Sequence, residues 1–277
     1  MILKHPTKMN DKISVVTVCF NAESEIEDTI RSILKQKYER IEYVIKDGGS
    51  TDKTNEIVEK YKALFYRKGI ALKHLSAKDN GIYDAMNIAV KRCEGDWIIF
   101  MNAGDLFYND TVLADLFEDK DRKGSDVLYG HTLIRISDRR GYIVNHSDCF
   151  LDEGMSLCHQ SLFVRKELML KFPFDVHYKI KADYEQMLRL KRSGMVFTAV
   201  NSIVSDRSRR GISNDLVALR NREDNMLRSR YQLQWKKKSV VLGYLKQFVK
   251  KIMPGPTTLW NVRDREKKIM KYKSKSG

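Results

Sequence analysis

The first hundred residues alternate between short continuous apolar runs and longer stretches with an apolar residue at every third or fourth position. Continuous runs are typical of strands buried on both faces, and the wider spacing is typical of amphipathic helices. The pattern predicts four strands, at residues 13–20, 41–45, 71–75 and 97–101. It predicts three helices between them, at residues 25–36, 52–61 and 82–92. A β-α-β-α-β-α-β series indicates a mainly parallel sheet with helices on both faces.

The pattern becomes less regular after residue 105. Further strands are expected at residues 127–129, 132–136 and 196–200. Helices are expected at residues 165–171 and 182–192, with a long polar helix at residues 214–234. The sequence Pro254-Gly255-Pro256 then divides the remaining tail into two pieces.

Charge sets the C-terminus apart from the rest of the chain. The net charge is +15, and residues 236–277 hold 13 Lys and Arg against 2 Asp and Glu. The tail therefore carries +11, and the first 235 residues carry only +4. This distribution argues against a nucleic-acid-binding domain, which would carry its basic patch on the folded part. The 42% hydrophobic content is typical of a folded protein.

The cysteines and the apolar runs indicate a compartment. Four scattered cysteines without a C-x-x-C pair suit a reducing environment and argue against a disulfide framework or a zinc site: Cys19, Cys93, Cys149 and Cys158. Residues 1–12 contain no apolar signal-peptide core, and the longest clean apolar run, residues 97–101, is too short to span a bilayer. We expect a cytoplasmic protein.

Polar residues and glycines follow all four predicted strands. Asn21 follows the first, D-G-G-S-T-D at 47–52 the second, K-D-N-G at 78–81 the third, and N-A-G-D at 102–105 the fourth. Ligands bind beyond the carboxyl ends of strands in open α/β sheets, so this convergence predicts a binding site. Asp47 could accept hydrogen bonds from a nucleobase or a ribose. Asp105 could bind a divalent cation that bridges a diphosphate.

Structural alternatives remain open for each of these segments. A D-G-G-S-T-D stretch can be a strand-to-helix turn with a capped helix, and a single Asp at a strand end can be a turn or cap residue. Other nucleotide-binding folds fit less well. The chain has neither G-x-G-x-x-G after the first strand nor G-x-x-x-x-G-K-[ST].

Four ordered motifs carry a family resemblance. They are VVTVCFN at 15–21, DGGSTDKT at 47–54, DNGIYDAMN at 79–87 and FMNAGD at 100–105. Over about residues 12–215 the chain resembles family 2 glycosyltransferases of the GT-A fold, above all bacterial enzymes of exopolysaccharide, O-antigen and colanic-acid assembly. The resemblance implies an α/β, Rossmann-like GT-A sheet flanked by helices. It also implies inverting transfer of a sugar from a nucleotide-diphosphate sugar to an acceptor hydroxyl.

The resemblance assigns donor-side roles to several residues. Thr17 and Asn21 would line the nucleotide pocket, and Asp47 would contact the base. The same likeness implies a ribose and diphosphate loop at Asp79 and Gly81, a donor contact at Asn102, and a Mg²⁺ or Mn²⁺ ligand at Asp105. The chain departs from the family's metal motif, because Asn102 and Gly104 stand where Asp is common. We therefore expect metal to bind weakly without nucleotide.

The second half would supply the acceptor site and the catalytic base. Asp183, in A-D-Y-E at 182–185, matches the family's acidic base motif, and Glu185 is the reserve candidate. The segment C-H-Q-S at 158–161, which contains His159, resembles a segment that lines the acceptor side. Residues 207–213 resemble a flexible loop that closes over the diphosphate, with Arg210 as the phosphate contact. The alternatives are a helix-dipole role for Asp183, a structural role for His159, and a solvated loop around Arg210.

These roles suggest three regions. Residues 1–130 would bind the nucleotide sugar, with a UDP-sugar favoured over a GDP- or dTDP-sugar. Residues 131–235 would bind a glycan or lipid-linked glycan. Residues 236–277 would form a basic helical extension whose apolar face lies on an anionic inner membrane surface or packs on the domain.

Two other functions remain to be distinguished. The missing metal-motif acids would also suit a catalytically inactive sugar-nucleotide-binding or scaffold protein. The pI of about 9.5 would suit a nucleic-acid binder, although the charge distribution does not.

Overall fold

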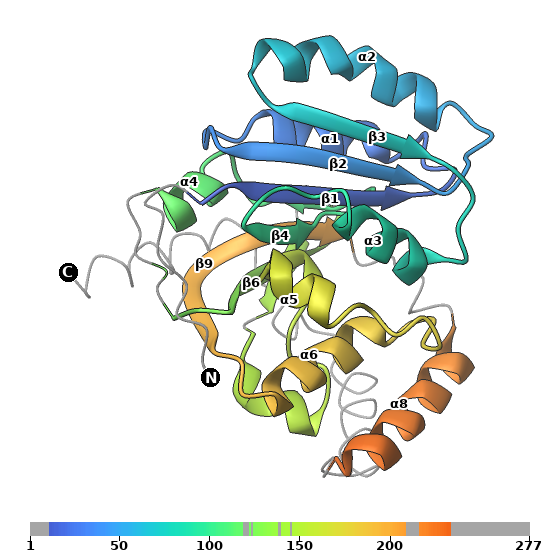
Figure 1. The fold of residues 1–277 in the computed structure, drawn as a ribbon, viewed down its shortest axis with the longest axis vertical. Coiled ribbons are helices and arrows are strands. Elements are labelled where there is room, and N and C mark those ends of the chain that lie inside the picture. The colour runs from blue at the N-terminus through green and yellow to red at the C-terminus, as the bar shows by residue number, and fades with distance from the viewer. Residues whose placement is uncertain are drawn as a thin grey trace, which may run out of the picture.

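The computed structural model describes residues 11–118, 122, 124–137, 140–144, 146–208 and 216–233. Across these residues one nine-stranded sheet runs through the molecule, with helices on both of its faces (Figure 1). This is the α/β architecture that the apolar pattern predicts. The expected basic extension, residues 236–277, lies outside the described residues.

The first half of the chain folds as its pattern predicts. Its elements are β1 (Ile13–Cys19), α1 (Ile26–Leu34), β2 (Ile41–Asp47), α2 (Thr54–Arg67), β3 (Ala71–Ser76), α3 (Ile82–Val90) and β4 (Trp97–Phe100). The four strands are parallel and lie in the order β3-β2-β1-β4. Helix α2 continues past Tyr61 because Phe65 extends its buried face.

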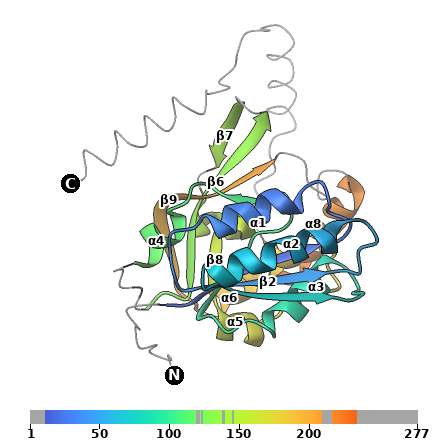
Figure 2. The same cartoon turned by 90° about the horizontal axis from the view of Figure 1, so that it is seen from above.

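The second half completes the sheet with mixed strand directions. Its elements are β5 (Leu106–Phe107), α4 (Val112–Phe117), β6 (Val127–Ser137), β7 (Arg140–Val144), η1 (Asp148–Glu153), η2 (His159–Ser161), β8 (Leu162–Arg165), α5 (Lys166–Lys171), α6 (Ala182–Arg192), β9 (Phe197–Ser208) and α8 (Val217–Tyr231). The sheet continues from β4 in the order β8-β6-β9-β5. Strand β8 is antiparallel to β4 and β6, whereas β9 is parallel to β6. Figure 2 shows the β6–β7 hairpin projecting from the body of the fold.

Two expectations for the second half were wrong in extent. The strands predicted at 127–129 and 132–136 are one strand, β6, which passes through Gly130. A Cβ atom at Gly130 would lie 2.6 Å from Val204 Cγ2 and 2.7 Å from the Ser202 carbonyl oxygen, so the close approach of β9 requires glycine here. The pairing register with β9 shifts at this point. The strand predicted at 196–200 continues to Ser208, because β9 lies between β6 and β5.

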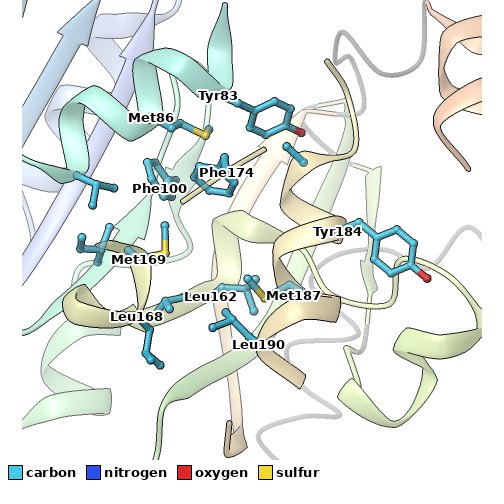
Figure 3. Packing of buried hydrophobic residues seen from close by; sticks show 14 of the residues in the cluster. Tyr83, Met86, Phe100, Leu162, Leu168, Met169, Phe174, Tyr184, Met187 and Leu190 are labelled. Carbon is cyan, nitrogen blue, oxygen red and sulfur yellow. The ribbon is translucent and has the colours of Figure 1, made fainter. Parts of the chain in front are cut away.

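Apolar side chains form a core on each face of the sheet. Ile13 and Val15 point toward the layer of α1 and α2, and Val16 and Val18 toward the layer of α3, α5 and α6. In the second layer the rings of Tyr83 and Phe174 lie 5.4 Å apart between centroids (Figure 3). The Tyr83 ring thereby fixes α3 against the segment that leads into α6.

No helix within the described residues is long and apolar enough to cross a membrane.

Candidate active site

The carboxyl ends of β1 to β4 meet at one edge of the sheet. Cys19 at the end of β1 is in register with Asp47 at the end of β2, which is in register with Ser76 at the end of β3. Met101, directly after β4, donates its backbone N–H to the Val16 carbonyl oxygen at 2.8 Å. The four predicted polar segments therefore begin side by side.

Asp47 organises the turn after β2. Its carboxylate is fully buried, and Oδ2 accepts hydrogen bonds from Gly49 N (3.1 Å), Ser50 N (2.9 Å), Ser76 Oγ (2.6 Å) and Asn55 Nδ2 (3.2 Å). Burial alone would raise the pKa of Asp47, but the hydrogen bonds outweigh it and hold the pKa below its ordinary value. The carboxylate fixes the shape of the nucleotide-side turn and ties it to β3.

Asn21 and Thr17 support the same edge in different ways. Asn21 has a positive φ of 50°, and its Oδ1 accepts the backbone N–H of Thr51 at 2.9 Å. Thr17 is fully buried, and its hydroxyl donates to the Met101 carbonyl oxygen at 2.5 Å while accepting from Tyr43 Oη at 2.9 Å. Asn21 is exposed, so a ligand at this edge could reach it. Thr17 lies beneath the edge and joins β1 to the end of β4.

A buried lysine holds the loop after β3. Lys46 is 1% exposed, and its Nζ donates to the carbonyl oxygens of Asp47 (2.7 Å) and Ala77 (2.6 Å) and to Asp79 Oδ2 (2.7 Å). Asp79 Oδ1 accepts the Gly81 N–H at 3.1 Å, and Gly81 begins α3 with a φ of 114°. The sequence analysis did not identify Lys46. Its only signal is a single cation inside an otherwise buried strand.

Phe20 is a second residue that the sequence analysis did not single out, although it lies within the first motif. Its side chain follows β1 and is 63% exposed. A Cβ placed on Gly48 would contact the Phe20 side chain at 3.3 Å and Asp79 Oδ2 at 3.2 Å, so the ring borders the turn after β2 and the loop after β3. An exposed aromatic ring at this edge offers a flat surface for a nucleobase.

The turn after β4 is fastened to α1. Thr29 Oγ1 donates to the Asp105 carbonyl oxygen at 2.9 Å and accepts the Gly104 N–H at 2.9 Å. Gly104 has a φ of 90°, which favours glycine. Within the described part of the chain, Asn102 Oδ1 is a buried acceptor without a hydrogen-bond donor. A buried acceptor of this kind is costly unless a ligand satisfies it.

Asp105 points from this turn toward η2. Its Oδ2 accepts a hydrogen bond from Gln160 Nε2 at 3.0 Å. Burial raises the pKa of Asp105 above its ordinary value, and the nearby His159 and Arg207 only partly oppose this effect. The ionised carboxylate is therefore short of compensating charge. The sequence analysis gave Gln160 no role of its own, although it lies next to His159 in the C-H-Q-S segment at 158–161.

His159 joins the turn after β4 to the start of α6. Its Nδ1 lies 3.1 Å from Asp183 Oδ2, and its Nε2 lies 3.4 Å from Asn102 Nδ2. Asp183 Oδ1 accepts the Tyr184 N–H at 2.8 Å and lies 3.1 Å from Tyr83 Oη. The structure thus brings together the predicted base, the predicted donor contact and a histidine from three distant parts of the sequence.

Glu223 of α8 holds the segment that leads into α6. Its carboxylate is 2% exposed and accepts the backbone N–H groups of Lys179 (2.6 Å), Ile180 (3.0 Å) and Lys181 (2.9 Å). These groups precede Asp183 directly, so the position of the predicted base depends on α8. The sequence analysis expected a polar helix here without assigning it this contact.

The structure describes one of the two remaining candidates, the reserve base Glu185, but not Arg210. Glu185 is fully buried, and its carboxylate accepts from Arg189 Nε at 2.8 Å and from Tyr231 Oη at 2.5 Å, away from His159. The structure therefore gives the reserve base a packing role between α6 and α8. Arg210 lies outside the described residues.

The residues at the edge fit a divalent cation only together with a ligand. Among the described residues, no three His, Cys, Asp or Glu side chains gather into a group that could hold a metal ion. Asp105 nevertheless offers a hard carboxylate oxygen whose ionised form a cation would stabilise. The remaining oxygen ligands would have to come from a bound diphosphate.

Comparisons of the sequence with known proteins identify a family. Residues 14–182 match the model of the family described as Glycosyl transferase family 2. The chain is 28% identical over 208 residues to a PGL/p-HBAD biosynthesis glycosyltransferase of Mycobacterium bovis, covering 74% of this chain and 80% of the relative. It is 33% identical over 183 residues to an uncharacterized glycosyltransferase of Mycobacterium tuberculosis, covering 64% of this chain and 68% of the relative.

Solved structures show the same fold. The structure of S. aureus TarS 1-349 in complex with UDP-GlcNAc has a TM-score of 0.57 at 22% identity, covering 72% of this chain and 59% of that chain. Glucosyl-3-phosphoglycerate synthase from Mycobacterium tuberculosis, in complex with Mn²⁺, UDP and glucosyl-3-phosphoglycerate, has a TM-score of 0.52 at 18% identity and covers 81% of both chains. The expected GT-A fold and the expected enzyme class, a glycosyltransferase, are confirmed. The chain belongs to glycosyl transferase family 2.

Proposed function

We propose that this enzyme transfers a sugar from a nucleotide-diphosphate sugar to an acceptor hydroxyl with inversion at the anomeric carbon. The observation that carries the proposal is the bridge from Asp183 through His159 to Asn102, which places one carboxylate beside the donor-side turn. An inverting transfer needs one base, because the acceptor hydroxyl attacks from the face opposite the leaving diphosphate. Asp183 is the proposed base.

The donor would lie along the edge formed by β1 to β4. The exposed Phe20 ring would stack on the nucleobase, with Asn21 and the turn organised by Asp47 beside it. The loop of Asp79 and Gly81 would lie along the ribose and diphosphate. Thr17 would act by supporting this edge from below. A UDP-sugar is the favoured donor, because TarS was solved with UDP-GlcNAc, and a GDP- or dTDP-sugar is the alternative.

We infer that Asp105 holds Mg²⁺ or Mn²⁺ together with the donor diphosphate, and that Asn102 Oδ1 faces the same ligand. The metal would neutralise the leaving diphosphate. Two relatives in the fold comparison were solved with Mn²⁺, a mannosyltransferase of Pyrobaculum calidifontis and the glucosyl-3-phosphoglycerate synthase. Arg210 is the proposed further diphosphate contact.

The acceptor side and the tail complete the proposal. Residues 1–130 would supply most of the donor site and residues 131–235 the acceptor site, with His159 between them. The acceptor would be a glycan, favoured as a lipid-linked glycan of bacterial cell-surface polysaccharide synthesis. Residues 236–277, with a charge of +11, would hold the enzyme at the inner face of the cell membrane.

A transfer assay with two variants tests the proposal. Wild-type protein is incubated with Mn²⁺ and a panel of UDP-, GDP- and dTDP-sugars, and NMR determines the anomeric configuration of the product. Asp183→Asn should bind donor normally but lose transfer by roughly 10²–10⁴-fold, the contribution of a positioned base. Glu185→Gln, on the same helix, should keep transfer.

Three outcomes would contradict parts of this proposal. Retention of configuration would exclude the inverting mechanism. A loss of transfer in Glu185→Gln but not in Asp183→Asn would make Glu185 the base instead of Asp183. Donor binding without transfer or hydrolysis across acceptors would favour the inactive sugar-nucleotide-binding protein.

A further inference from the structure

His159 occupies the centre of the candidate active site without a role in the proposed chemistry. It belongs to η2, which packs against β4, β6 and β9. Its ring lies between two partners that are far apart in sequence, Asp183 at one nitrogen (3.1 Å) and the Asn102 amide at the other (3.4 Å). A ring that is hydrogen-bonded at both nitrogens keeps one orientation, so it can orient the side chains of Asp183 and Asn102.

The His159 ring is the main side-chain hydrogen-bond partner of the Asp183 carboxylate. Three groups lie within hydrogen-bond distance of its carboxylate: Tyr83 Oη, Tyr184 N and His159 Nδ1. The Tyr83 hydroxyl has one proton and lies closer to the Ile180 carbonyl oxygen, at 2.7 Å, than to Asp183 Oδ1. That proton is therefore engaged by the backbone. His159 Nδ1 remains as the side-chain donor to Asp183 and the sole hydrogen-bond partner of Oδ2 among the described residues.

The partners also determine the protonation of the ring. A carboxylate only accepts hydrogen bonds, so the proton of a neutral His159 lies on Nδ1 and Nε2 carries the lone pair. The Asn102 amide nitrogen then donates to Nε2, while Asn102 Oδ1 lacks a donor in the described part of the chain. The same ring thus contacts the base on the acceptor side and a residue of the donor-side turn.

We propose that His159 is a positioning residue that aims the Asp183 carboxylate at the acceptor hydroxyl by donating from Nδ1 to Oδ2. This inference rests on the proposed transfer with Asp183 as base. His159 acts through Asp183, and the proton released by the acceptor goes to the carboxylate. Tyr184 N and His159 Nδ1 donate to two of roughly four acceptor positions on the carboxylate, and the Tyr83 hydroxyl oxygen lies against Oδ1, so few directions remain open to the substrate.

Within the described residues, few charged or titratable groups surround the pair. Asp183 faces His159 from η2, Tyr83 from α3 and Lys181 at the start of its own helix. His159 also faces Asp105, and Arg207 of β9 lies near that carboxylate. Burial alone would raise the pKa of Asp183, but the hydrogen bond from His159, together with the Tyr184 N–H and the nearby Lys181, keeps the pKa below its ordinary value. Loss of the Nδ1 donor should therefore raise this pKa.

Two conservative substitutions separate the nitrogens of the ring. In His159→Asn the amide nitrogen falls near the position of Nδ1, and in His159→Gln it falls near that of Nε2. If His159 positions Asp183 through Nδ1, His159→Asn should retain kcat within about tenfold. His159→Gln and His159→Ala should lose about 10–100-fold, part of the full contribution of the base. The KM for the nucleotide sugar should change much less than kcat in His159→Gln and His159→Ala.

The pH dependence gives a second readout. The base must be ionised, so a higher pKa of Asp183 moves the acid limb of the kcat profile to higher pH in His159→Gln and His159→Ala. In His159→Asn the limb should stay near its wild-type position. ¹³C NMR titration of the Asp183 carboxyl, assigned with Asp183→Asn, measures the same shift in the full-length protein without substrate.

The outcomes separate this inference from the proposed function. If kcat of His159→Asn falls as far as kcat of His159→Gln, Nε2 takes part directly and the positioning role is overturned. Wild-type kcat and Asp183 pKa in all three variants would also overturn it. If the wild-type protein transfers no sugar, the proposed function fails, and the NMR titration alone then decides whether His159 sets the state of Asp183.

Discussion

At the scale of single residues, carboxylates at the edge of the sheet have opposite environments. Asp47 accepts from several donors, and its pKa is lowered, so its charge is satisfied by the protein. Asp105 has one side-chain donor among the described residues, Gln160, and burial raises its pKa. A carboxylate that the protein leaves undercompensated is the one that gains most from a cation. The difference favours a structural role for Asp47 and supports the proposed ligand-binding role of Asp105.

This contrast predicts the effect of Asp105→Ala. The variant should fold, because the Thr29 bonds to this turn use backbone atoms of Gly104 and Asp105. It should lose the increase in nucleotide affinity that Mn²⁺ gives the wild type, and with it transfer. Isothermal titration calorimetry with and without Mn²⁺ is the measurement. If Mn²⁺ increases the nucleotide affinity of the variant as much as that of the wild type, Asp105 is not a metal ligand.

Residue types at strand ends could be predicted, but their partners could not. The turns containing Asp47, Asp79 and Asp105 follow apolar runs that mark buried strands, so their meeting at one edge follows from parallel pairing. The contact of Asp105 with Gln160 spans 55 residues. It depends on η2 and β8 returning beside β4 in the antiparallel sense, which no local pattern encodes.

At the scale of elements, α8 supports α6 through one buried carboxylate. Glu223 accepts three backbone N–H groups directly before Asp183. In addition, Tyr231 at the end of α8 donates to Glu185 of α6 at 2.5 Å. Because α8 and α6 are joined by these polar contacts, the base position depends on a helix that carries no predicted catalytic residue.

We expect Glu223→Gln to loosen the start of α6. The amide group cannot accept all three N–H donors, and a buried donor without a partner costs about 1–3 kcal/mol. Chemical denaturation should show this loss, and hydrogen exchange at residues 179–184 should become faster. Transfer should fall while nucleotide binding remains. The exposed Asn225→Ala on the same helix is the control, with a change within about 0.5 kcal/mol. Equal exchange rates in both variants would contradict the role of Glu223.

The predicted elements were most accurate where strands are parallel and buried. Strands β1, β2 and β4 are buried along most or all of their length, whereas the edge strand β3 is only half-buried, and the helices between the strands have clear amphipathic faces. Strand β6 was divided in the prediction because Gly130 interrupts its apolar pattern, although that glycine is required by the approach of β9. Strands β5 and β8 were missed because two and four residues are too short to show a period.

At the scale of the whole molecule, charge is concentrated beyond the described fold. The first 235 residues carry +4 and the last 42 carry +11, and this segment contains apolar residues spaced as on one face of an expected helix, among them Val241, Leu245 and Phe248. Each Lys or Arg near an anionic surface contributes about 1 kcal/mol, and an apolar face adds burial at the headgroup boundary. The proposed membrane role thus depends on a segment separate from the strand-end motifs.

Removal of residues 236–277 should therefore separate binding from targeting. The truncated protein should retain donor affinity, because the four motifs lie before residue 106. It should lose binding to anionic vesicles at low salt in co-sedimentation, and lose more activity on a lipid-linked acceptor than on a soluble analogue. Equal co-sedimentation of both proteins would exclude the membrane role.

The place of β9 in the sheet has a consequence for the order in which the site is assembled during synthesis. The turn of residues 102–105 is flanked by β4 and β5, and β5 joins the sheet through β9, which emerges from the ribosome about a hundred residues later. Until then β5 and the matching edge of β6 lack their neighbour. Such delayed long-range pairing is slow and leaves edges open to wrong partners. The nascent chain can build its first four strands early, yet the turn of residues 102–105 is secured at both ends only after Ser208.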